Sequence, residues 1–146
     1  MALRDQEYQK QEKMNGIVYD MSPAADYNHG ILNGNIYQIV RAGLKNSLCL
    51  VFIENLDFKY HPDLNDDYVR PDIMVVCDRT NLKGASYRGV PKFIVETLSL
   101  STSKRDRTAK KDAYEQAGVE EYWLVSPKGF LDIYYLKDGK YVLEQS

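Results

Sequence analysis

The chain has 146 residues, of which 44% are hydrophobic and 27% are charged, with a formal net charge of -2 at pH 7. This length and composition indicate a single globular domain over residues 1–146 and exclude a largely disordered chain. The slight excess of acidic residues excludes attraction of nucleic acid by the whole molecule, so any such binding would need a local basic patch.

The first 14 residues are polar and are expected to form a flexible or helical lead-in. They do not resemble a signal peptide, and no apolar run approaches the roughly 18 residues that suggest a membrane span. Cys49 and Cys77 each lie within an apolar run and are predicted to be buried free thiols, which fits a reducing compartment. We therefore expect a cytoplasmic protein without a membrane partner.

Hydrophobic spacing predicts the elements of the first half of the chain. A short strand is expected at residues 16–23, followed by a helix at 26–45 that Asp26 or Asn28 would cap. A continuous apolar run at 47–54 has the length of a buried strand. The polar segment after it reads as a loop with, at most, a short edge strand.

The second half predicts two further strands, at residues 72–77 and 92–98, separated by a loop with glycines and a proline. Residues 103–118 read as a helix that Gly118 closes. A strand at 121–126 and a C-terminal hairpin complete the chain. This order predicts an α/β or α+β fold with helices packed against one mixed sheet.

Glu96 lies in the middle of an apolar strand pattern, where a carboxylate is costly unless it is paired or holds a metal. Consecutive strands joined by a loop are expected to pair antiparallel. Asp72, at the start of one strand, should then lie beside Glu96, near the end of the other. Such an oxygen-only pair suits Mg²⁺ or Mn²⁺, although ordinary hairpins also carry two acids.

The helix at 103–118 adds a lysine to this edge. Asp106 and Lys110 fall within its apolar face, so Lys110 points at the sheet and can reach the two acids. The alternative is that Lys110 only pairs with Asp106, four residues earlier, with its charge at the surface. Both contacts can exist together.

Three stretches, RPDIMVV, FIVETLSLST and DRTAKKDAYEQAGVEEYWLVSP, resemble the restriction-endonuclease-like proteins called the Uma-two family. That family is part of the PD-(D/E)XK nuclease superfamily, and the resemblance covers roughly residues 15 to 136. It implies a restriction-endonuclease-like fold, with an αβββαβ core and a C-terminal hairpin.

The resemblance also implies a set of site residues. Asp72 and Glu96 would be the metal-binding acids, and a recurring histidine, here His29, would lie near the site, with a surface or helix-capping histidine as the alternative. We further expect the backbone carbonyl of Thr97 to join the two acids as a metal ligand. The superfamily lysine normally stands two residues after the glutamate, where this chain has Leu98. Lys110 on the next helix takes its place.

These residues lead us to expect a Mg²⁺- or Mn²⁺-dependent endonuclease that hydrolyses DNA; the sequence leaves the choice between DNA and RNA open. Lys110 would orient or deprotonate the attacking water or neutralise the phosphate, and Asp106 would position Lys110. An exposed basic stripe could bind phosphates, with a solvated helix face as the alternative reading: Lys104, Arg105, Arg107 and Lys111.

Analogy with such enzymes suggests a homodimer, because one active site cuts one strand. The alternative function is a catalytically weak or inactive module on the same fold that binds nucleic acid or another partner. A purely structural homo-oligomer is a third reading and would bind neither metal nor nucleic acid.

Overall fold

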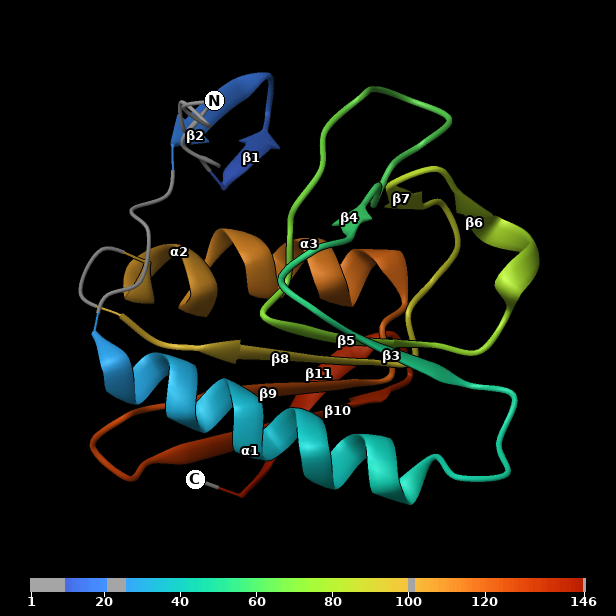
Figure 1. Ribbon diagram of the computed structural model, residues 1–146. Coiled ribbons are helices and arrows are strands. Elements are labelled where there is room, and N and C mark those ends of the chain that lie inside the picture. The colour runs from blue at the N-terminus through green and yellow to red at the C-terminus, as the bar shows by residue number, and fades with distance from the viewer. Residues whose placement is uncertain (1–9, 21–25, 100–101, 146) are drawn as a thin grey trace, which may run out of the picture.

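The computed structural model describes residues 10–20, 26–99 and 102–145 (Figure 1). The elements follow one another as β1 Gln11–Met14, β2 Ile17–Asp20, α1 Tyr27–Gly43, β3 Leu50–Ile53, β4 Asp57–Phe58, β5 Ile73–Val76, a 3₁₀ turn at Arg79–Asn81, β6 Leu82–Lys83, β7 Ser86–Tyr87, β8 Phe93–Thr97, α2 Ser103–Arg107, α3 Ala109–Ala117, β9 Glu121–Val125, β10 Leu131–Lys137 and β11 Lys140–Gln145.

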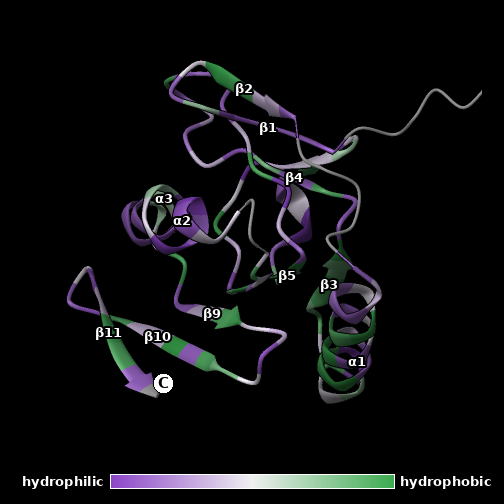
Figure 2. Cartoon of the chain, turned by 90° about the vertical axis from the view of Figure 1, so that its left-hand side faces the viewer, coloured by the Kyte–Doolittle hydropathy of each residue, from purple (hydrophilic) through white to green (hydrophobic). Residues whose placement is uncertain are grey.

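A six-stranded mixed sheet in the order β11-β10-β9-β8-β5-β3 forms the centre of the fold. Only β8 and β9 pair parallel, with α2 and α3 between them in the chain, and the other neighbours pair antiparallel. The helix α1 lies against one face of the sheet and the pair α2–α3 lies against the other, as the two views agree (Figures 1 and 2). The predicted mixed sheet flanked by helices, with a C-terminal hairpin, is confirmed.

The main core lies between the sheet and α3. Tyr114 of α3 and Tyr122 of β9 are fully buried, and their rings meet edge to face with centroids 5.0 Å apart. Met74 and Ile94 pack into the same cluster from β5 and β8. Full burial of an apolar side chain of this size stabilises the fold by about 1.5–3 kcal/mol, so this cluster fixes α3 on the sheet.

The helix α1 begins at the predicted cap, since the Asp26 side chain accepts a hydrogen bond from the Asn28 N–H at 2.7 Å. Its one buried residue is Asn33, which is polar and faces the sheet. A buried amide is costly unless its hydrogen bonds are made. The packing face of α1 therefore brings polar groups, together with apolar ones, to this end of the sheet.

The single helix expected over residues 103–118 is interrupted at Thr108, whose backbone (φ -121°, ψ -87°) leaves the helical region. The Thr108 hydroxyl donates to the Lys104 carbonyl at 2.6 Å, and such bonds compete with the regular helix ladder. After the break, α3 ends as predicted at Gly118, which has a φ of +92°.

The lead-in expected over residues 1–14 is wrong for its described part, because residues 11–14 form β1 and pair with β2. Asn15 and Gly16 form the connecting turn, and both have positive φ, as a two-residue hairpin requires. This Asn-Gly pair was the sequence signal for the hairpin. Backbone hydrogen bonds between Lys13 and Tyr68 (2.8 and 2.9 Å) attach the hairpin to the rest of the chain. Residues 1–9 lie outside the described part.

The prediction of free thiols is also wrong, because Cys49 and Cys77 form a disulfide. Leu50 pairs with Val76 at the ends of β3 and β5, so the next residues, Cys49 and Cys77, face each other with Cα atoms 4.0 Å apart. A cytoplasmic location loses the support that reduced thiols would give. Among the described residues, no helix is long and apolar enough to span a membrane.

Candidate active site

Three acids stand in a row across neighbouring strands at one edge of the sheet. Ile73 pairs with Val95, so Asp72 lies opposite Glu96, one position beyond the last pair of β5 and β8. This confirms the predicted meeting of the two acids, and both are buried, with exposures of 3% and 2%. Ile53 pairs with Ile73 in the same way, which places Glu54 beside Asp72 on the other side.

The two oxygens of Asp72 have different neighbours. Oδ2 accepts the Thr97 N–H at 2.7 Å and lies 3.7 Å from Nε2 of His29. Oδ1 lies 3.3 Å from the ammonium of Lys10, which the sequence did not single out. Burial alone would raise the pKa of Asp72, but the charge of Lys10 above all, together with the hydrogen bond from the Thr97 N–H, brings it below its usual value. Asp72 is therefore held as a carboxylate.

A candidate metal centre is formed by His29, Glu54 and Asp72, whose possible ligand atoms all lie within 4.8 Å of one another. They come from α1, the end of β3 and the start of β5. One imidazole and two carboxylates suit a divalent ion such as Mn²⁺, whereas Mg²⁺ prefers oxygen ligands alone. The donor set thus fits the expected class of ion.

Glu54 was missed in the sequence, where it was the last residue of a predicted strand. Its backbone has a φ of +54°, in the left-handed region that non-glycine residues rarely occupy. Burial, and then the nearby charge of Asp72, raise the pKa of Glu54. The sequence signal for Glu54 was its position at the end of a predicted strand, since the next strand to pair with it begins at another acid, Asp72.

Asn33 connects the members of this centre. Its Oδ1 accepts the Thr97 hydroxyl, so its Nδ2 donates to Glu54 Oε1 at 3.2 Å and faces His29 Nδ1 at 3.3 Å. Since Nδ2 can only donate, Nδ1 of His29 accepts and its proton is on Nε2. That Nε2 donates to the Thr97 carbonyl at 3.1 Å. The Thr97 carbonyl, predicted as a metal ligand, therefore lies at the centre and contacts the imidazole.

A second cluster surrounds Lys110. Its ammonium lies 2.9 Å from Glu12 Oε2, 3.3 Å from Glu96 Oε1 and 3.3 Å from Asp106 Oδ1, and all four side chains are at most 2% exposed. The sequence predicted the contacts with Glu96 and Asp106 but missed Glu12 together with its strand. Tyr114 donates its hydroxyl to Glu96 Oε1 at 2.9 Å.

The charged groups in this cluster shift one another's pKa values. Burial acts to lower the pKa of Lys110, but Glu96, Glu12 and Asp106 outweigh it, so the pKa of Lys110 is well above its usual value. Burial raises the pKa of Glu96 well above its usual value although Lys110 opposes the shift, and it raises that of Asp106 too. Lys110 therefore carries a permanent positive charge, and Glu96 binds a proton more readily than a solvated glutamate.

The four basic residues expected to line one exposed stripe point in different directions. Lys104 is exposed, while Arg105 turns inward to lie 3.6 Å from Glu12 and over the ring of Tyr19. Arg107 reaches Asp132 at 3.2 Å, and the ammonium of Lys111 lies 4.5 Å from the centre of the Tyr134 ring. Both of the latter extend over β10.

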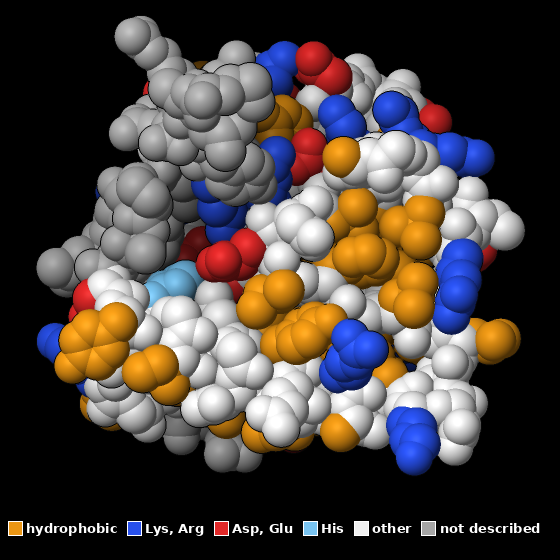
Figure 3. All heavy atoms as spheres, viewed as in Figure 1, with side chains coloured by type: hydrophobic (Ala, Val, Ile, Leu, Met, Phe, Trp, Pro, Cys, Tyr) orange, Lys and Arg blue, Asp and Glu red, His pale blue; other side chains and the backbone are white. Residues whose placement is uncertain are grey.

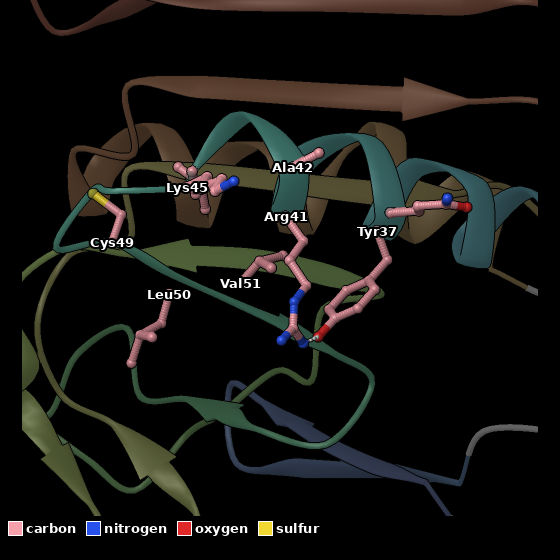
Figure 4. A pocket seen from close by; sticks show the side chains of 9 residues that line it. Tyr37, Arg41, Ala42, Lys45, Cys49, Leu50 and Val51 are labelled. Atoms are coloured by element: carbon pink, nitrogen blue, oxygen red, sulfur yellow. Dashed lines mark hydrogen bonds between the residues drawn. The ribbon is translucent and has the colours of Figure 1, made fainter.

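Figure 3 shows acidic, basic and histidine side chains gathered above the N-terminal part of α1. A separate hollow of about 680 Å³ lies between the C-terminal part of α1 and β3 (Figure 4). In it, Arg41 donates to the Tyr37 hydroxyl at 3.2 Å. The described residues that line this hollow include no histidine, Asp or Glu. The candidate active site therefore lies at the sheet edge that carries Glu54, Asp72 and Glu96.

Comparison with protein-family models shows which family the chain belongs to. The model of the family "Uma2: Putative restriction endonuclease" matches residues 1–146. The chain belongs to the Uma2 family. This confirms the resemblance to Uma-two proteins that the sequence motifs carried.

One curated protein and one solved structure are similar to this Uma2 chain. The uncharacterised protein slr1290 of Synechocystis sp. is 28% identical over 136 residues, which are 92% of this chain and 70% of that protein. A crystal structure of a "putative nuclease belonging to DUF820" from Anabaena variabilis is similar, with a TM-score of 0.75 and 17% identity. The alignment covers 93% of this chain and 76% of that one, and at this identity it shows a shared fold.

Proposed function

We propose that this Uma2 protein is a metal-dependent endonuclease that hydrolyses phosphodiester bonds in DNA. The observation that carries the proposal is the convergence of His29, Glu54 and Asp72, with ligand atoms within 4.8 Å, beside the buried pair of Glu96 and Lys110. The family description, "Putative restriction endonuclease", and the shared fold with the "putative nuclease" from Anabaena variabilis support the same reaction class.

Glu54 and Asp72 would hold the ion through carboxylate oxygens, with the Thr97 carbonyl next to them. His29 would join them through one ring nitrogen after giving up its hydrogen bond to Asn33 or to the Thr97 carbonyl. This set differs from the expected ligands Asp72, Glu96 and Thr97, because Glu96 Oε1 is engaged by Lys110 and Tyr114. A bound Mn²⁺ or Mg²⁺ would polarise the phosphate and make a water molecule more acidic.

The residues of the chain have separable tasks in this proposal. Lys110, held by three carboxylates, is a fixed positive charge that offsets negative charge developing on the phosphate. Glu96, whose pKa is raised by burial, accepts the proton of the attacking water through its carboxylate. Asp106 acts through Lys110 and is a positioning residue.

Substrate binding and assembly form part of the same proposal. Lys104, Arg107 and Lys111 present positive charge along α2 and the start of α3, where DNA phosphates would be contacted. Arg105 is committed to Glu12 and contributes to the cluster instead. Cutting both strands of a duplex would require a homodimer, because one chain carries one such centre among its described residues.

The test combines ion binding with cleavage. Mn²⁺ is titrated by calorimetry into the wild type, Asp72→Asn and the surface control Glu120→Gln, and supercoiled DNA is incubated with each protein in Mn²⁺ or in excess EDTA. We expect the wild type and Glu120→Gln to bind Mn²⁺ and nick DNA, and Asp72→Asn to do neither.

Two observations favour the alternative of an inactive binding module: Leu98 occupies the usual position of the lysine, and Lys110 is already surrounded by three acids. Such a module would shift DNA in a mobility assay without any cleavage that depends on Mn²⁺. That result, or cleavage that survives in Asp72→Asn, would overturn the proposed enzyme.

A further inference from the structure

The strand β1 and the residue before it send two side chains of opposite charge into the site. Lys10 approaches Asp72, and Glu12, two residues later, approaches Lys110. Residues two apart in an extended chain point to the same side, so both reach the centre together. The N-terminal segment thus supplies a lysine to the carboxylate of Asp72 in the sheet and a glutamate to the ammonium of Lys110 on α3.

Lys10 belongs to the candidate metal centre, because its ion pair with Asp72 is largely shielded from solvent. Its side chain is 17% exposed, and its ammonium lies 3.3 Å from Asp72 Oδ1, the oxygen that faces away from the contacts with Thr97 and His29. The Lys10 ammonium therefore stands against the Asp72 oxygen that would otherwise be open to a cation.

The charges of the described residues in and around the two clusters do not balance. Five carboxylates face three side-chain cations, which leaves an excess of two negative charges when all are ionised: Glu12, Glu54, Asp72, Glu96 and Asp106 against Lys10, Arg105 and Lys110. One divalent ion would neutralise this excess, and a second would reverse it.

We propose that Lys10 is a fixed cation of the metal centre, which takes the place at Asp72 Oδ1 that a second divalent ion would otherwise occupy. This inference rests on the proposed function, in that Asp72 is taken to be a metal ligand. Lys10 then limits the centre to one ion and weakens the binding of that ion by repulsion.

The experiment measures Mn²⁺ affinity and stoichiometry by calorimetry for the wild type, Lys10→Met and Lys10→Arg. Methionine keeps the length of the side chain without its charge, and arginine keeps the charge. Lys13→Met is the matched control, because Lys13 lies three residues further along, within β1, and pairs with the exposed Asp66 at 2.6 Å. Circular dichroism and thermal melting report whether each variant is folded.

We expect Lys10→Met to bind Mn²⁺ about tenfold more tightly and to take up a second ion, because a unit positive charge next to the site is removed. Lys10→Arg and Lys13→Met should behave as the wild type. A residue that only fastened the hairpin would give weaker binding in Lys10→Met.

The other outcomes separate the two proposals. Unchanged or weaker binding by folded Lys10→Met, with binding by the wild type, overturns the role of Lys10 and leaves the metal centre standing. Binding by Lys10→Met alone would support Lys10 as the resident cation while the proposed metal-dependent enzyme fails. Absence of binding in both, or failure of Lys10→Met to fold while Lys10→Arg binds more tightly than the wild type, overturns the role of Lys10.

Discussion

Asp72 lies directly opposite Glu96 across the antiparallel strands β5 and β8, and both carboxylates are almost fully buried. Each carboxylate has its own cation: Lys10 is 3.3 Å from Asp72, and Lys110 is 3.3 Å from Glu96. Like charges this close repel unless cations or protons separate them. The pair thus joins the candidate metal centre on the side of α1 to the lysine cluster on the side of α3.

Replacement of Glu54 by glutamine tests whether Glu54, a residue that the sequence did not point to, binds the metal ion. Glutamine keeps the size of the side chain and its contact with Asn33 but removes the negative charge near Asp72. We expect Mn²⁺ affinity to fall by about tenfold or more, measured by calorimetry. Glu120→Gln serves as the control, because Glu120 is exposed and pairs only loosely with Lys92 at 3.8 Å. Equal affinity in both variants would remove Glu54 from the centre.

Lys110→Met should destabilise the fold strongly. It leaves Glu12, Glu96 and Asp106 buried without the cation they share. Loss of one partner from a buried ion pair costs about 3–5 kcal/mol, measured as the free energy of unfolding in urea. The neighbouring Lys111→Met, which removes only a contact with the Tyr134 ring, should cost less than about 1 kcal/mol.

A second variant shows whether charge is the cause. Lys110→Met combined with Glu12→Gln removes one cation and one carboxylate, so it should recover part of the lost stability. If the double variant is no more stable than Lys110→Met, packing of the lysine stem, and not charge, accounts for the loss.

The sequence predicted those features that follow from hydrophobic period and chain order. Glu96 was recognised because a carboxylate interrupts an apolar strand, and Lys110 because helical spacing placed it on the face with Tyr114. The meeting of Asp72 and Glu96 followed from antiparallel pairing of consecutive strands. In each case a local pattern determined which way the side chain would point.

The missed features depend on contacts between distant segments. Glu12 and Lys10 reach the site only because an Asn-Gly turn folds the N-terminal segment into a hairpin that bonds to Tyr68. Glu54 reaches it from a left-handed backbone conformation that no hydrophobic pattern encodes. The disulfide of Cys49 and Cys77 follows from the register of two strands, which composition does not give.

The disulfide should contribute measurably to stability. Cys49 and Cys77 are separated by 28 positions, so the bond restricts a long loop in the unfolded chain. The double variant Cys49→Ser, Cys77→Ser should lose about 2–4 kcal/mol of unfolding free energy in urea. A reducing agent should lower the wild type to the level of the variant and have no effect on the variant itself. Two titratable thiols in the native, untreated protein would contradict the bond.

Replacement by alanine should change the stability of the protein in opposite directions at two glycines. Gly118 closes α3 with a φ of +92°, where a side chain is strained, so Gly118→Ala should destabilise the protein by about 1–2 kcal/mol. Gly34 lies within α1, and a Cβ there would meet no atom within 4 Å. Because alanine restricts the unfolded chain and favours the helix, Gly34→Ala should stabilise it by about 0.5–1 kcal/mol. Urea midpoints for the two variants, measured against the wild type, check both signs. A loss of stability in Gly34→Ala would mean that α1 packs more closely against a neighbour in solution than its open surface indicates.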